Sequence, residues 1–352
     1  MKRFRQTFIR AGLDALYFSG AHLWLRPIFA GLGGIFMLHH VRPRRDGSFQ
    51  PNAHLEVTPD FLREMLMHLR AHDIEIIGID ELQRRLRERD TGHRFACFTF
   101  DDGYRDNRDF ALPVMREFGA PFTIYVTSEF AEGSGRLWWI ALEQVVARAD
   151  RIEVEIGGVP TRLDTGSAAG KCAAFRRLQD WLRALPGEHD LRREMSVLCA
   201  RHGVDEAAIA SDLCLSWHEW RGLDSEKLIT VGAHTLSHCN LAKQSEALAR
   251  SEMADSRSRI EAELQRPVQH MAYPYGDRSA AAAREFALAA AAGFKTAVTT
   301  RPGMIFPENA AHPTALPRVS LNGYYQDARV LPVLTSGAAT AMWNGFRRVD
   351  AA

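Results

Sequence analysis

The stretch FACFTFDDG, residues 95–103, is an apolar run that ends in two adjacent carboxylates and a glycine. A second stretch, LITVGAHTLSH at residues 228–238, has the same arrangement with two histidines in place of the carboxylates. In barrel folds, charged residues directly after a buried strand lie at the active face. Together the two stretches offer one Asp and two His to a metal ion and leave one Asp to move a proton. That is the minimum set for a metal-assisted hydrolase.

Strands and helices alternate around these two stretches. Further apolar runs predict strands at residues 34–38, 74–79, 121–126, 271–273 and 296–298. Between the strands, Thr58 and Pro59 predict the N-cap and first residue of a helix, because both residue types favour those positions. Other helices are expected at residues 80–89, 107–118, 247–264 and 280–292. This alternation predicts an α/β fold, specifically a parallel α/β barrel.

Residues 133–216 depart from this alternation. The segment RIEVEI at 151–156 alternates polar and apolar residues, and Gly157-Gly158 then predicts a hairpin with residues 159–163. Two helical stretches come next, at residues 171–185 and 191–202. We therefore expect an N-terminal amphipathic segment at residues 1–33 and a barrel at 34–325 with an α+β insertion at about 133–216. Residues 326–352 then form a C-terminal tail.

The composition excludes several classes of protein. The 352 residues carry 44 Lys and Arg against 43 Asp and Glu, so no basic excess points to nucleic acid. The five cysteines form no Cys-x-x-Cys pair, which is typical of a reducing compartment rather than a disulfide framework. The N-terminus lacks the apolar stretch and cleavage site of a signal peptide. We expect a cytoplasmic protein that can also associate with the inner face of a membrane.

The first residues predict an amphipathic helix. Apolar side chains recur at helical spacing on one face, opposite Lys and Arg. These apolar residues are Phe4, Phe8, Ile9, Leu13, Leu16 and Tyr17. Two interpretations remain open: the helix makes a peripheral membrane contact, or its apolar face packs against the barrel floor.

The residue types at the two stretches suggest how the chemistry is divided. Adjacent carboxylates repel, so the one that no cation neutralises should have a raised pKa. If Asp102 binds a metal, Asp101 is then the general base. Asp-Asp-Gly is also common in turns, which is the structural alternative. His234 and His238, four residues apart, are expected on one side of a helical turn, where both could bind one ion; a surface pair is the alternative.

Three motifs carry a resemblance to a known family. FTFDDG at 98–103 and HTLSH at 234–238 resemble the first two motifs of the polysaccharide deacetylase group (NodB-homology, carbohydrate esterase family 4). YPYG at 273–276 resembles the third, and residues 296–303 and 316–318 resemble the closing strands. The resemblance implies a distorted (β/α)7 barrel and metal-dependent removal of an acetyl group from an N-acetylated sugar.

The resemblance also implies a role for each motif residue. Asp101 would be the catalytic base that activates metal-bound water, and Asp102, His234 and His238 the metal ligands. In the third motif, Pro274 and Tyr275 would contact the substrate, and the Tyr275 N–H would hold the oxyanion. These ligands suit one divalent ion, with Zn²⁺ as the first expectation and Co²⁺ or Ni²⁺ compatible. Trp139 is either a wall for the sugar or a packed core residue.

The chain departs from the family pattern at two places. Many members have an arginine that orients the base two residues before the proline of the third motif, where this chain has Ala272. Many also have a late histidine that protonates the leaving amine, where this chain reads LPR at 316–318. MLHHV at 37–41 resembles the first strand of the poly-N-acetylglucosamine deacetylase branch. His39 is therefore expected as the general acid, with His40 as its rival and His312 as an outside candidate.

The expected function is removal of an N-acetyl group from an amino sugar of a polysaccharide or lipid-linked saccharide. Two alternatives remain. The departures would suit a catalytically silent carbohydrate-binding or scaffold protein of polysaccharide assembly. A deformylase or O-acetyl esterase would use the same metal and base and differ only in the acyl group.

Overall fold

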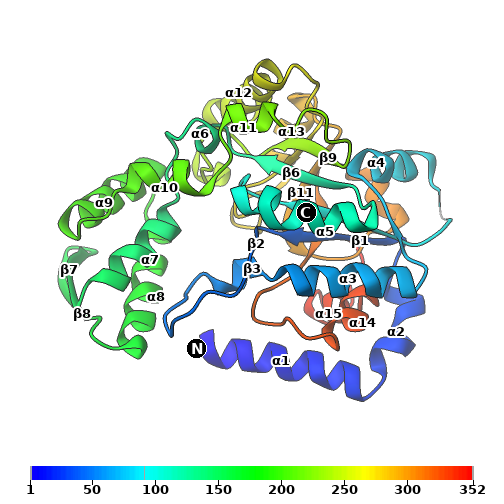
Figure 1. The fold of residues 1–352 in the computed structure, drawn as a ribbon, viewed down its shortest axis with the longest axis horizontal. Coiled ribbons are helices and arrows are strands. Elements are labelled where there is room, and N and C mark those ends of the chain that lie inside the picture. The colour runs from blue at the N-terminus through cyan, green and yellow to red at the C-terminus, as the bar shows by residue number, and fades with distance from the viewer. Residues whose placement is uncertain (1, 91, 351–352) are drawn as a thin grey trace.

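Seven parallel strands close into a barrel at the centre of the molecule (Figure 1). The computed structural model describes residues 2–90 and 92–350. Around the ring the order is β1-β12-β11-β10-β9-β6-β5, and β5 pairs back with β1. The strands are β1 (Gly33–Leu38), β5 (Phe95–Phe100), β6 (Phe122–Val126), β9 (Ile229–Ala233), β10 (His270–Ala272), β11 (Thr296–Pro302) and β12 (Leu316–Ser320). The predicted (β/α)7 barrel is confirmed.

The apolar runs form strands because most of their side chains are buried on both faces of the sheet. All six residues of β5 are buried. Ala96, Phe98 and Phe100 pack in the core cluster shared with the surrounding helices, and Phe95 and Cys97 pack in a second cluster on the other face. Buried parallel strands read as nearly continuous apolar runs for this reason. Because Leu38 pairs with Phe100, the chain leaves β1 and β5 at the same level, and His39 emerges beside Asp101.

Helices on the outside cover the strands. They are α3 (Pro59–Ala71), α4 (Ile79–Glu88), a π-helical turn at Asn107–Ala111, α5 (Leu112–Phe118), α6 (Ser128–Ala131), α11 (Trp217–Arg221), α12 (Glu246–Leu264) and α13 (Ala283–Ala291). The predicted cap of α3 is confirmed, because the Phe61 N–H donates to the Thr58 hydroxyl over 3.2 Å. Pro113 lies at the start of α5, directly after the π-helical turn.

Short elements lie beside the seven-stranded ring. They are β2 (His40–Val41), β3 (Glu56–Val57), β4 (Glu75–Ile76) and 3₁₀ turns at Ala53–Leu55, Leu241–Lys243 and Pro307–Ala311. The strand expected at residues 74–79 is thus only two residues long, because the chain already turns into α4 at Ile79.

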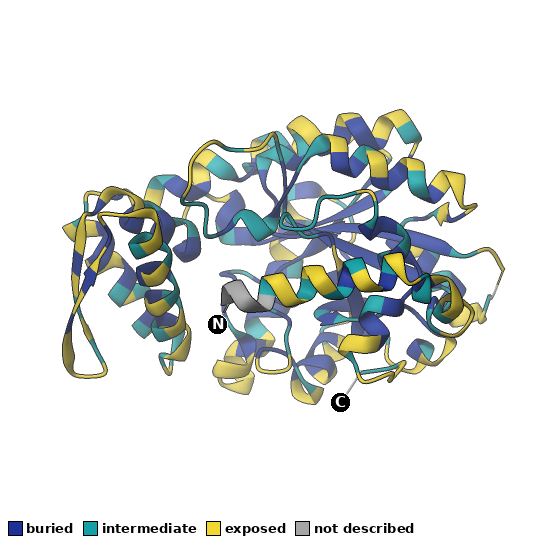
Figure 2. Ribbon diagram, turned by 90° about the horizontal axis from the view of Figure 1, so that it is seen from below, coloured by how far each residue is buried: buried dark blue, intermediate teal, exposed yellow. Residues whose placement is uncertain are grey.

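The segment after α6 forms a separate lobe, seen at the left of Figure 1. It contains α7 (Trp138–Arg148), β7 (Arg151–Ile156), β8 (Val159–Asp164), α8 (Ala168–Ala184), α9 (Glu188–Arg201) and α10 (Glu206–Leu213). The predicted hairpin is confirmed, with Gly157 and Gly158 both at positive φ between paired β7 and β8. One hydrophobic cluster joins these elements and also includes Tyr104 and Phe130 from outside the lobe; Figure 2 shows part of each helix of the lobe in the colour of buried residues.

The two ends of the chain pack on each other beside the barrel. α1 (Lys2–Phe18) and α2 (Ala21–Phe29) contact α14 (Val330–Thr335) and α15 (Ala338–Trp343). Leu13 and Leu16 of α1 are buried in a cluster with Val330 and Val333 of α14. The middle of the amphipathic face therefore packs inside the protein, while the side chains of residues 2–5, Phe4 among them, lie outside those described. Within residues 2–90 and 92–350, every helix is too short or too polar to cross a bilayer.

Candidate active site

Side chains from four strand ends meet at the carboxyl edge of the barrel. Asp101 and Asp102 come directly after β5, His39 after β1 and His234 after β9, and Tyr275 lies just beyond β10. The barrel brings these residues together because parallel strands all present their carboxyl ends at one rim. Residues separated by more than 100 positions in the sequence thus become neighbours.

Asp102, His234 and His238 form a cluster in which one ligand atom of each lies within 4.8 Å of the others. Asp102 Oδ1 lies 3.5 Å from His234 Nε2 and 3.3 Å from His238 Nε2. His234 Nδ1 is 2.8 Å from the Ala272 carbonyl, which fixes the proton on Nδ1 and leaves Nε2 as an electron-pair donor. Burial lowers the pKa of His234 to about 4, so the ring is neutral at physiological pH, as a ligand must be.

These three side chains fit a divalent cation. Asp102 Oδ1 is buried and has no hydrogen-bond partner among the described residues, so this oxygen presents unshared electron pairs to the cluster. A buried acceptor without a partner is costly unless an ion or water satisfies it. One carboxylate and two imidazoles are ligands that Zn²⁺, Co²⁺ and Ni²⁺ accept, and a three-ligand site leaves positions for water and substrate.

The expectation that the two histidines lie on a helical turn is wrong. Residues 234–238 form an irregular loop in which Thr235 and His238 have positive φ angles of 65° and 59°. The loop is closed by its own hydrogen bonds: the His238 N–H donates to Thr235 Oγ1, and Glu252 on α12 accepts from the N–H and hydroxyl of Ser237. The spacing of four residues therefore correctly predicted that the two histidines lie close together, but a loop and not a helix brings them there.

Backbone strain is concentrated at this rim. Of the eight described non-glycine residues with positive φ, four belong to the site: Asp102, Thr235, His238 and Tyr275. Such conformations cost about 1–3 kcal/mol each and persist where the surrounding structure enforces them. Tyr275, at φ 62°, is the centre of a tight turn closed by a 2.7 Å hydrogen bond from the Gly276 N–H to the Pro274 carbonyl.

Asp101 is held by Arg318, which no local sequence pattern assigned. The two Nη atoms of Arg318 lie 2.7 Å from the two carboxylate oxygens of Asp101, and both side chains are almost fully buried. Arg318 Nε donates to the Thr299 carbonyl, which fixes the guanidinium plane. An arginine inside the apolar strand LPRVS was the available sequence signal, because a buried charge needs a partner.

The expectation of a raised Asp101 pKa is also wrong. Burial alone would raise the pKa, but the Arg318 guanidinium outweighs it, and the pKa of Asp101 lies below its ordinary value. Arg318 thus contacts the predicted base from β12, whereas the family arginine would come from the position of Ala272 on β10.

The three histidines considered for the acid lie in different surroundings. His39 Nε2 is 3.8 Å from Asp101 Oδ2, at the rim of the cluster. His40 faces away: its Nδ1 lies 2.7 Å from Asp106 and its ring stacks on Tyr104. His312 is exposed ahead of β12, at the amino end of that strand and so at the opposite edge of the barrel.

Aromatic rings surround His238. The rings of Trp139, Tyr275 and Phe130 have their centres 4.8, 5.4 and 5.7 Å from its imidazole. Trp138 donates its indole N–H to the Tyr275 hydroxyl, so the inserted lobe is joined to the third motif. Trp139 is buried and contacts a proposed metal ligand, so the two alternatives for this residue are not exclusive.

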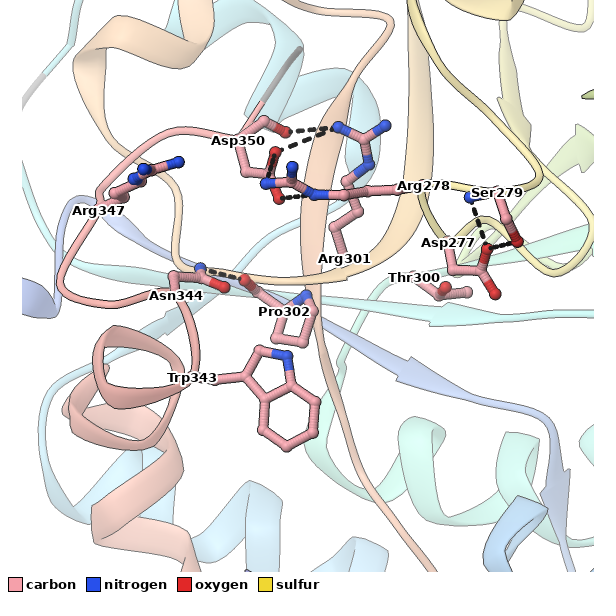
Figure 3. A pocket seen from close by; sticks show the side chains of 10 residues that line it. All are labelled: Asp277, Arg278, Ser279, Thr300, Arg301, Pro302, Trp343, Asn344, Arg347 and Asp350. Atoms are coloured by element: carbon pink, nitrogen blue, oxygen red, sulfur yellow. Dashed lines mark hydrogen bonds and ion pairs between the residues drawn. The ribbon is translucent and has the colours of Figure 1, made fainter.

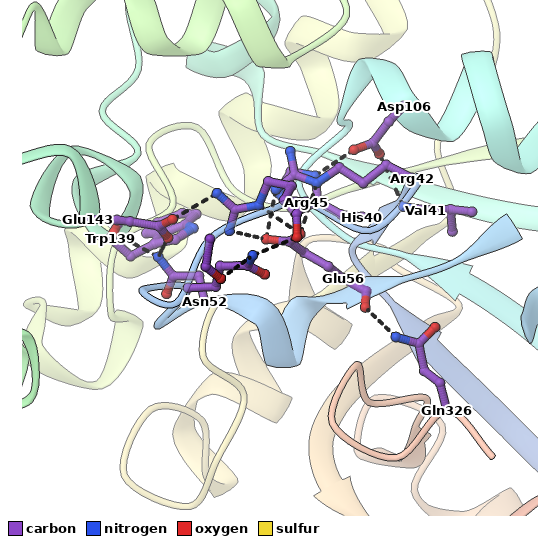
Figure 4. Close-up of polar contacts among 12 residues, drawn as sticks. His40, Val41, Arg42, Arg45, Asn52, Glu56, Asp106, Trp139, Glu143 and Gln326 are labelled. Atoms are coloured by element: carbon purple, nitrogen blue, oxygen red, sulfur yellow. Dashed lines mark hydrogen bonds and ion pairs between the residues drawn. The ribbon is translucent and has the colours of Figure 1, made fainter. Parts of the chain in front are cut away.

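A polar network fixes α7, and with it Trp139, to the barrel (Figure 4). Asn52, in the segment between β2 and β3, donates to the Trp139 carbonyl and to Glu143. Arg45 from the same segment bridges Glu143 and Glu56. Because these groups are largely buried, the network holds the aromatic wall in place over the cluster.

Comparisons with known proteins find one family model that matches the chain. The family model described as polysaccharide deacetylase matches residues 88–158 and 200–297. The gap between the matched ranges falls within the inserted lobe. None of the curated proteins compared with the chain matches it.

Solved structures share the fold. The Streptococcus pyogenes deacetylase PplD, solved with acetate, has a TM-score of 0.55 at 17% identity, covering 82% of this chain and 92% of its own. A putative polysaccharide deacetylase from Bacillus anthracis has a TM-score of 0.50 at 15% identity over 82% of this chain. A polysaccharide deacetylase from Bacillus cereus has a TM-score of 0.50 at 16% identity over the same share. The chain spans 65% and 64% of these two Bacillus proteins.

Proposed function

Because the polysaccharide deacetylase family model matches residues 88–158 and 200–297, we propose that the chain removes the N-acetyl group from an amino sugar with the help of one divalent metal ion. The substrate class is a polysaccharide or a lipid-linked saccharide. The observation that supports this proposal is the cluster of Asp102, His234 and His238, whose ligand atoms lie within 4.8 Å of one another, with Asp101 as the neighbour of Asp102 in the chain.

Asp102, His234 and His238 would hold the ion, with Zn²⁺ as the first choice and Co²⁺ or Ni²⁺ as alternatives. When bound, a divalent ion supplies Lewis acidity, which makes water easier to deprotonate and polarises the acetyl carbonyl. The Ala272 carbonyl supports this role by fixing the His234 tautomer.

Asp101 would accept the proton of the attacking water. Its lowered pKa keeps it ionised at neutral pH, and the double contact with Arg318 aims its oxygens. The same contact makes Asp101 a weak base, so deprotonation depends on water that is already acidified. Arg318 is therefore a positioning residue that sets both the charge and the direction of the base.

His39 would give a proton to the departing amine; because burial lowers the pKa of His39, its ring is neutral at rest, and the proton that it gives would be the one that Asp101 takes from the water. Its ring lies 3.8 Å from Asp101, on the β1 side of the cluster, where a proton could pass to the leaving nitrogen. On the β10 side, the backbone N–H of Tyr275 would donate to the tetrahedral oxyanion, and the turn at Pro274 fixes its direction. Trp139 would form a wall for the sugar ring.

The silent scaffold alternative loses one of its two grounds, because Arg318 occupies the role left open by Ala272. The deformylase and O-acetyl esterase alternatives share every residue of the site and are separated only by assay. A location in the cytoplasm, at the inner face of a membrane, is proposed from the sequence alone.

The test is acetate release from N-acetylated oligosaccharides and sugar-lipids by metal-loaded protein, followed as the loss of one acetyl mass. Asp101→Asn should abolish turnover and keep the metal, because the metal ligands are untouched. His234→Ala should lose the metal. His312→Ala, an exposed histidine outside the site, is the matched control and should retain metal and activity.

Three results would count against the proposal or change it. Turnover in Asp101→Asn would remove the base assignment. Wild-type protein that holds a metal but releases acetate from no substrate in the panel would favour the scaffold alternative, and release of formate or of O-linked acetate alone would change the acyl group.

A further inference from the structure

Large apolar side chains are exposed on the helices at the two ends of the chain. On α2, Trp24 is 82% and Leu23 60% exposed, and Ile28 lies four residues after Trp24 on the same helix face. At the other end, Met342, Trp343 and Phe346 are each more than half exposed. Exposed tryptophan is unusual, and apolar side chains gathered at one place mark an interaction site.

These side chains belong to one surface. α2 packs beside α15, and the rings of Phe29 and Phe346 lie 5.7 Å apart. Phe18, exposed at the end of α1, precedes α2 closely in the chain. We call this surface the terminal apolar face; it consists of Phe18, Leu23, Trp24, Ile28, Met342, Trp343 and Phe346.

The charges in the sequence directly around the residues of the terminal apolar face have one sign, although Asp277 and Asp350 lie nearby at the hollow beside Trp343. Residues 15–34 and 336–349 contain three arginines, Arg26, Arg347 and Arg348, and no Asp or Glu. All three arginines are exposed. The nearest acidic groups in the flanking sequence are engaged elsewhere: Asp14 and Asp327 face Arg329, and Asp350 binds Arg278 and Arg301.

We propose that the terminal apolar face docks onto an anionic lipid bilayer. Tryptophan, leucine and phenylalanine with arginines at their margin are the composition of proteins that lie in the bilayer interface, with rings at headgroup depth and cations on lipid phosphates. One of the two interpretations of the sequence was a membrane contact through the apolar face of α1. The structure buries Leu13 and Leu16 of that face and leaves Phe8 exposed, so the proposed contact lies mainly on α2 and α15.

The terminal apolar face extends towards the catalytic rim. Trp343 and Arg347 line a hollow of about 630 Å³ whose far wall includes Asp277 and Thr300 (Figure 3). Thr300 donates its hydroxyl to the Tyr275 carbonyl over 2.6 Å, so only one turn of chain separates this hollow from the proposed oxyanion donor. Docking would therefore bring a lipid-carried saccharide close to the site, a consequence that rests on the proposed function; the docking itself does not.

The test is flotation of the full-length protein with vesicles. Wild-type protein should bind vesicles containing about 30 mol% phosphatidylglycerol in phosphatidylcholine and bind pure phosphatidylcholine at least about tenfold more weakly, because the arginines then lack anionic headgroups. The double variant Leu23→Glu/Trp24→Glu should bind at least about tenfold more weakly, because two exposed apolar side chains that would enter the bilayer interface become charged. Leu248→Glu is the matched control, because Leu248 is a 48% exposed leucine on α12, away from this face, and its binding should equal that of wild type.

Each other outcome overturns the proposal. The proposal of docking onto lipid is refuted if the wild-type protein binds neither vesicle. It is also refuted if the double variant binds as well as wild type does. A wild-type dimer that becomes monomeric in the double variant, without vesicle binding, assigns the face to a second copy of the chain. Acetate release from a soluble oligosaccharide should be the same in wild type and double variant, so a failure of docking is distinguishable from a failure of the proposed activity.

Discussion

Asp101 and Arg318 are 217 residues apart in sequence and form one buried ion pair. Removing two charges from water is costly, and the cost is offset here by two parallel hydrogen bonds and further donors from Arg318 to Thr99 and Thr299. The pair gives the base a fixed charge and a fixed direction. It also means that neither partner can be removed without leaving the other charge uncompensated.

Substitutions of Arg318 can separate two effects on Asp101: the direction in which its carboxylate is held and the positive charge beside it. Arg318→Lys keeps one positive charge but replaces two parallel bonds by a point contact, so kcat should fall about 10- to 100-fold with little change in KM. Arg318→Met should instead destabilise the fold by about 3–5 kcal/mol, because Asp101 is left charged and buried. Steady-state kinetics and chemical denaturation measure the two effects. Equal kinetics of Arg318→Lys and wild type would reduce the arginine to a structural role.

His39 is tested through the leaving group. His39→Ala should lower the rate of amide cleavage about 100-fold or more, since general acids contribute about 10²–10⁴-fold where the leaving group needs a proton. An acetyl ester of an acidic phenol, which leaves without a proton, should be cleaved at nearly the wild-type rate. If the amide rate were unchanged, the acid would be His40 or water; if both substrates lost rate equally, His39 would have another role.

At the scale of elements, the segment between β2 and β3 connects the barrel to α7. Asn52 is buried and makes two hydrogen bonds to α7, one to the Trp139 carbonyl and one to Glu143. Arg45 adds an ion pair with Glu143. The wall beside His238 therefore depends on contacts made by a part of the chain 87 residues earlier.

Asn52→Ala should destabilise the protein by about 1–3 kcal/mol, because it leaves the buried Glu143 and Trp139 acceptors without this donor. It should also speed amide exchange in α7 and lower kcat/KM, since Trp139 loses its anchor. Hydrogen exchange and kinetics give the two readouts. Gln50→Ala removes a side chain from the same segment that bonds only to its backbone, and it should leave exchange in α7 unchanged.

At the scale of the whole molecule, α3 joins the barrel to the helices at the end of the chain. His68 of α3 lies 3.1 Å from the Thr335 hydroxyl of α14. Burial, reinforced by His72, Arg26 and Arg94, lowers the pKa of His68 to about 4. The unfolded chain, with a His pKa near 6.5, therefore takes up the proton first as the pH falls.

Stability contributed by neutral His68 is present above pH 6.5 and is lost between pH 6.5 and about 4. Because the side chain is only half-buried, we expect a loss of about 1 kcal/mol after solvent screening. His68→Gln should flatten the dependence of unfolding free energy on pH over this interval, and His93→Gln, an exposed histidine, should not. Chemical denaturation at several pH values measures this dependence. Parallel curves of unfolding free energy against pH for wild type and His68→Gln would refute the role of His68.

The amino-acid sequence by itself determined the barrel, its inserted hairpin and the group of side chains at the rim. These are consequences of local patterns, because a buried parallel strand needs an apolar run and the barrel places the residues after that run at one edge. The two stretches at residues 95–103 and 228–238 carry that information without reference to distant residues.

Only the tertiary structure decided which residues act on one another across the fold. Arg318 binds Asp101 because β12 and β5 both flank β1, and no local pattern records that neighbourhood. Tertiary structure also decided that His39 lies beside Asp101 while His40 contacts Asp106. It likewise decided the loop conformation at His238 and the burial of Leu13 and Leu16 against α14. Each depends on register or on packing between distant segments, and the free energy of such contacts is set by the partner rather than by the residue's own neighbours in the chain.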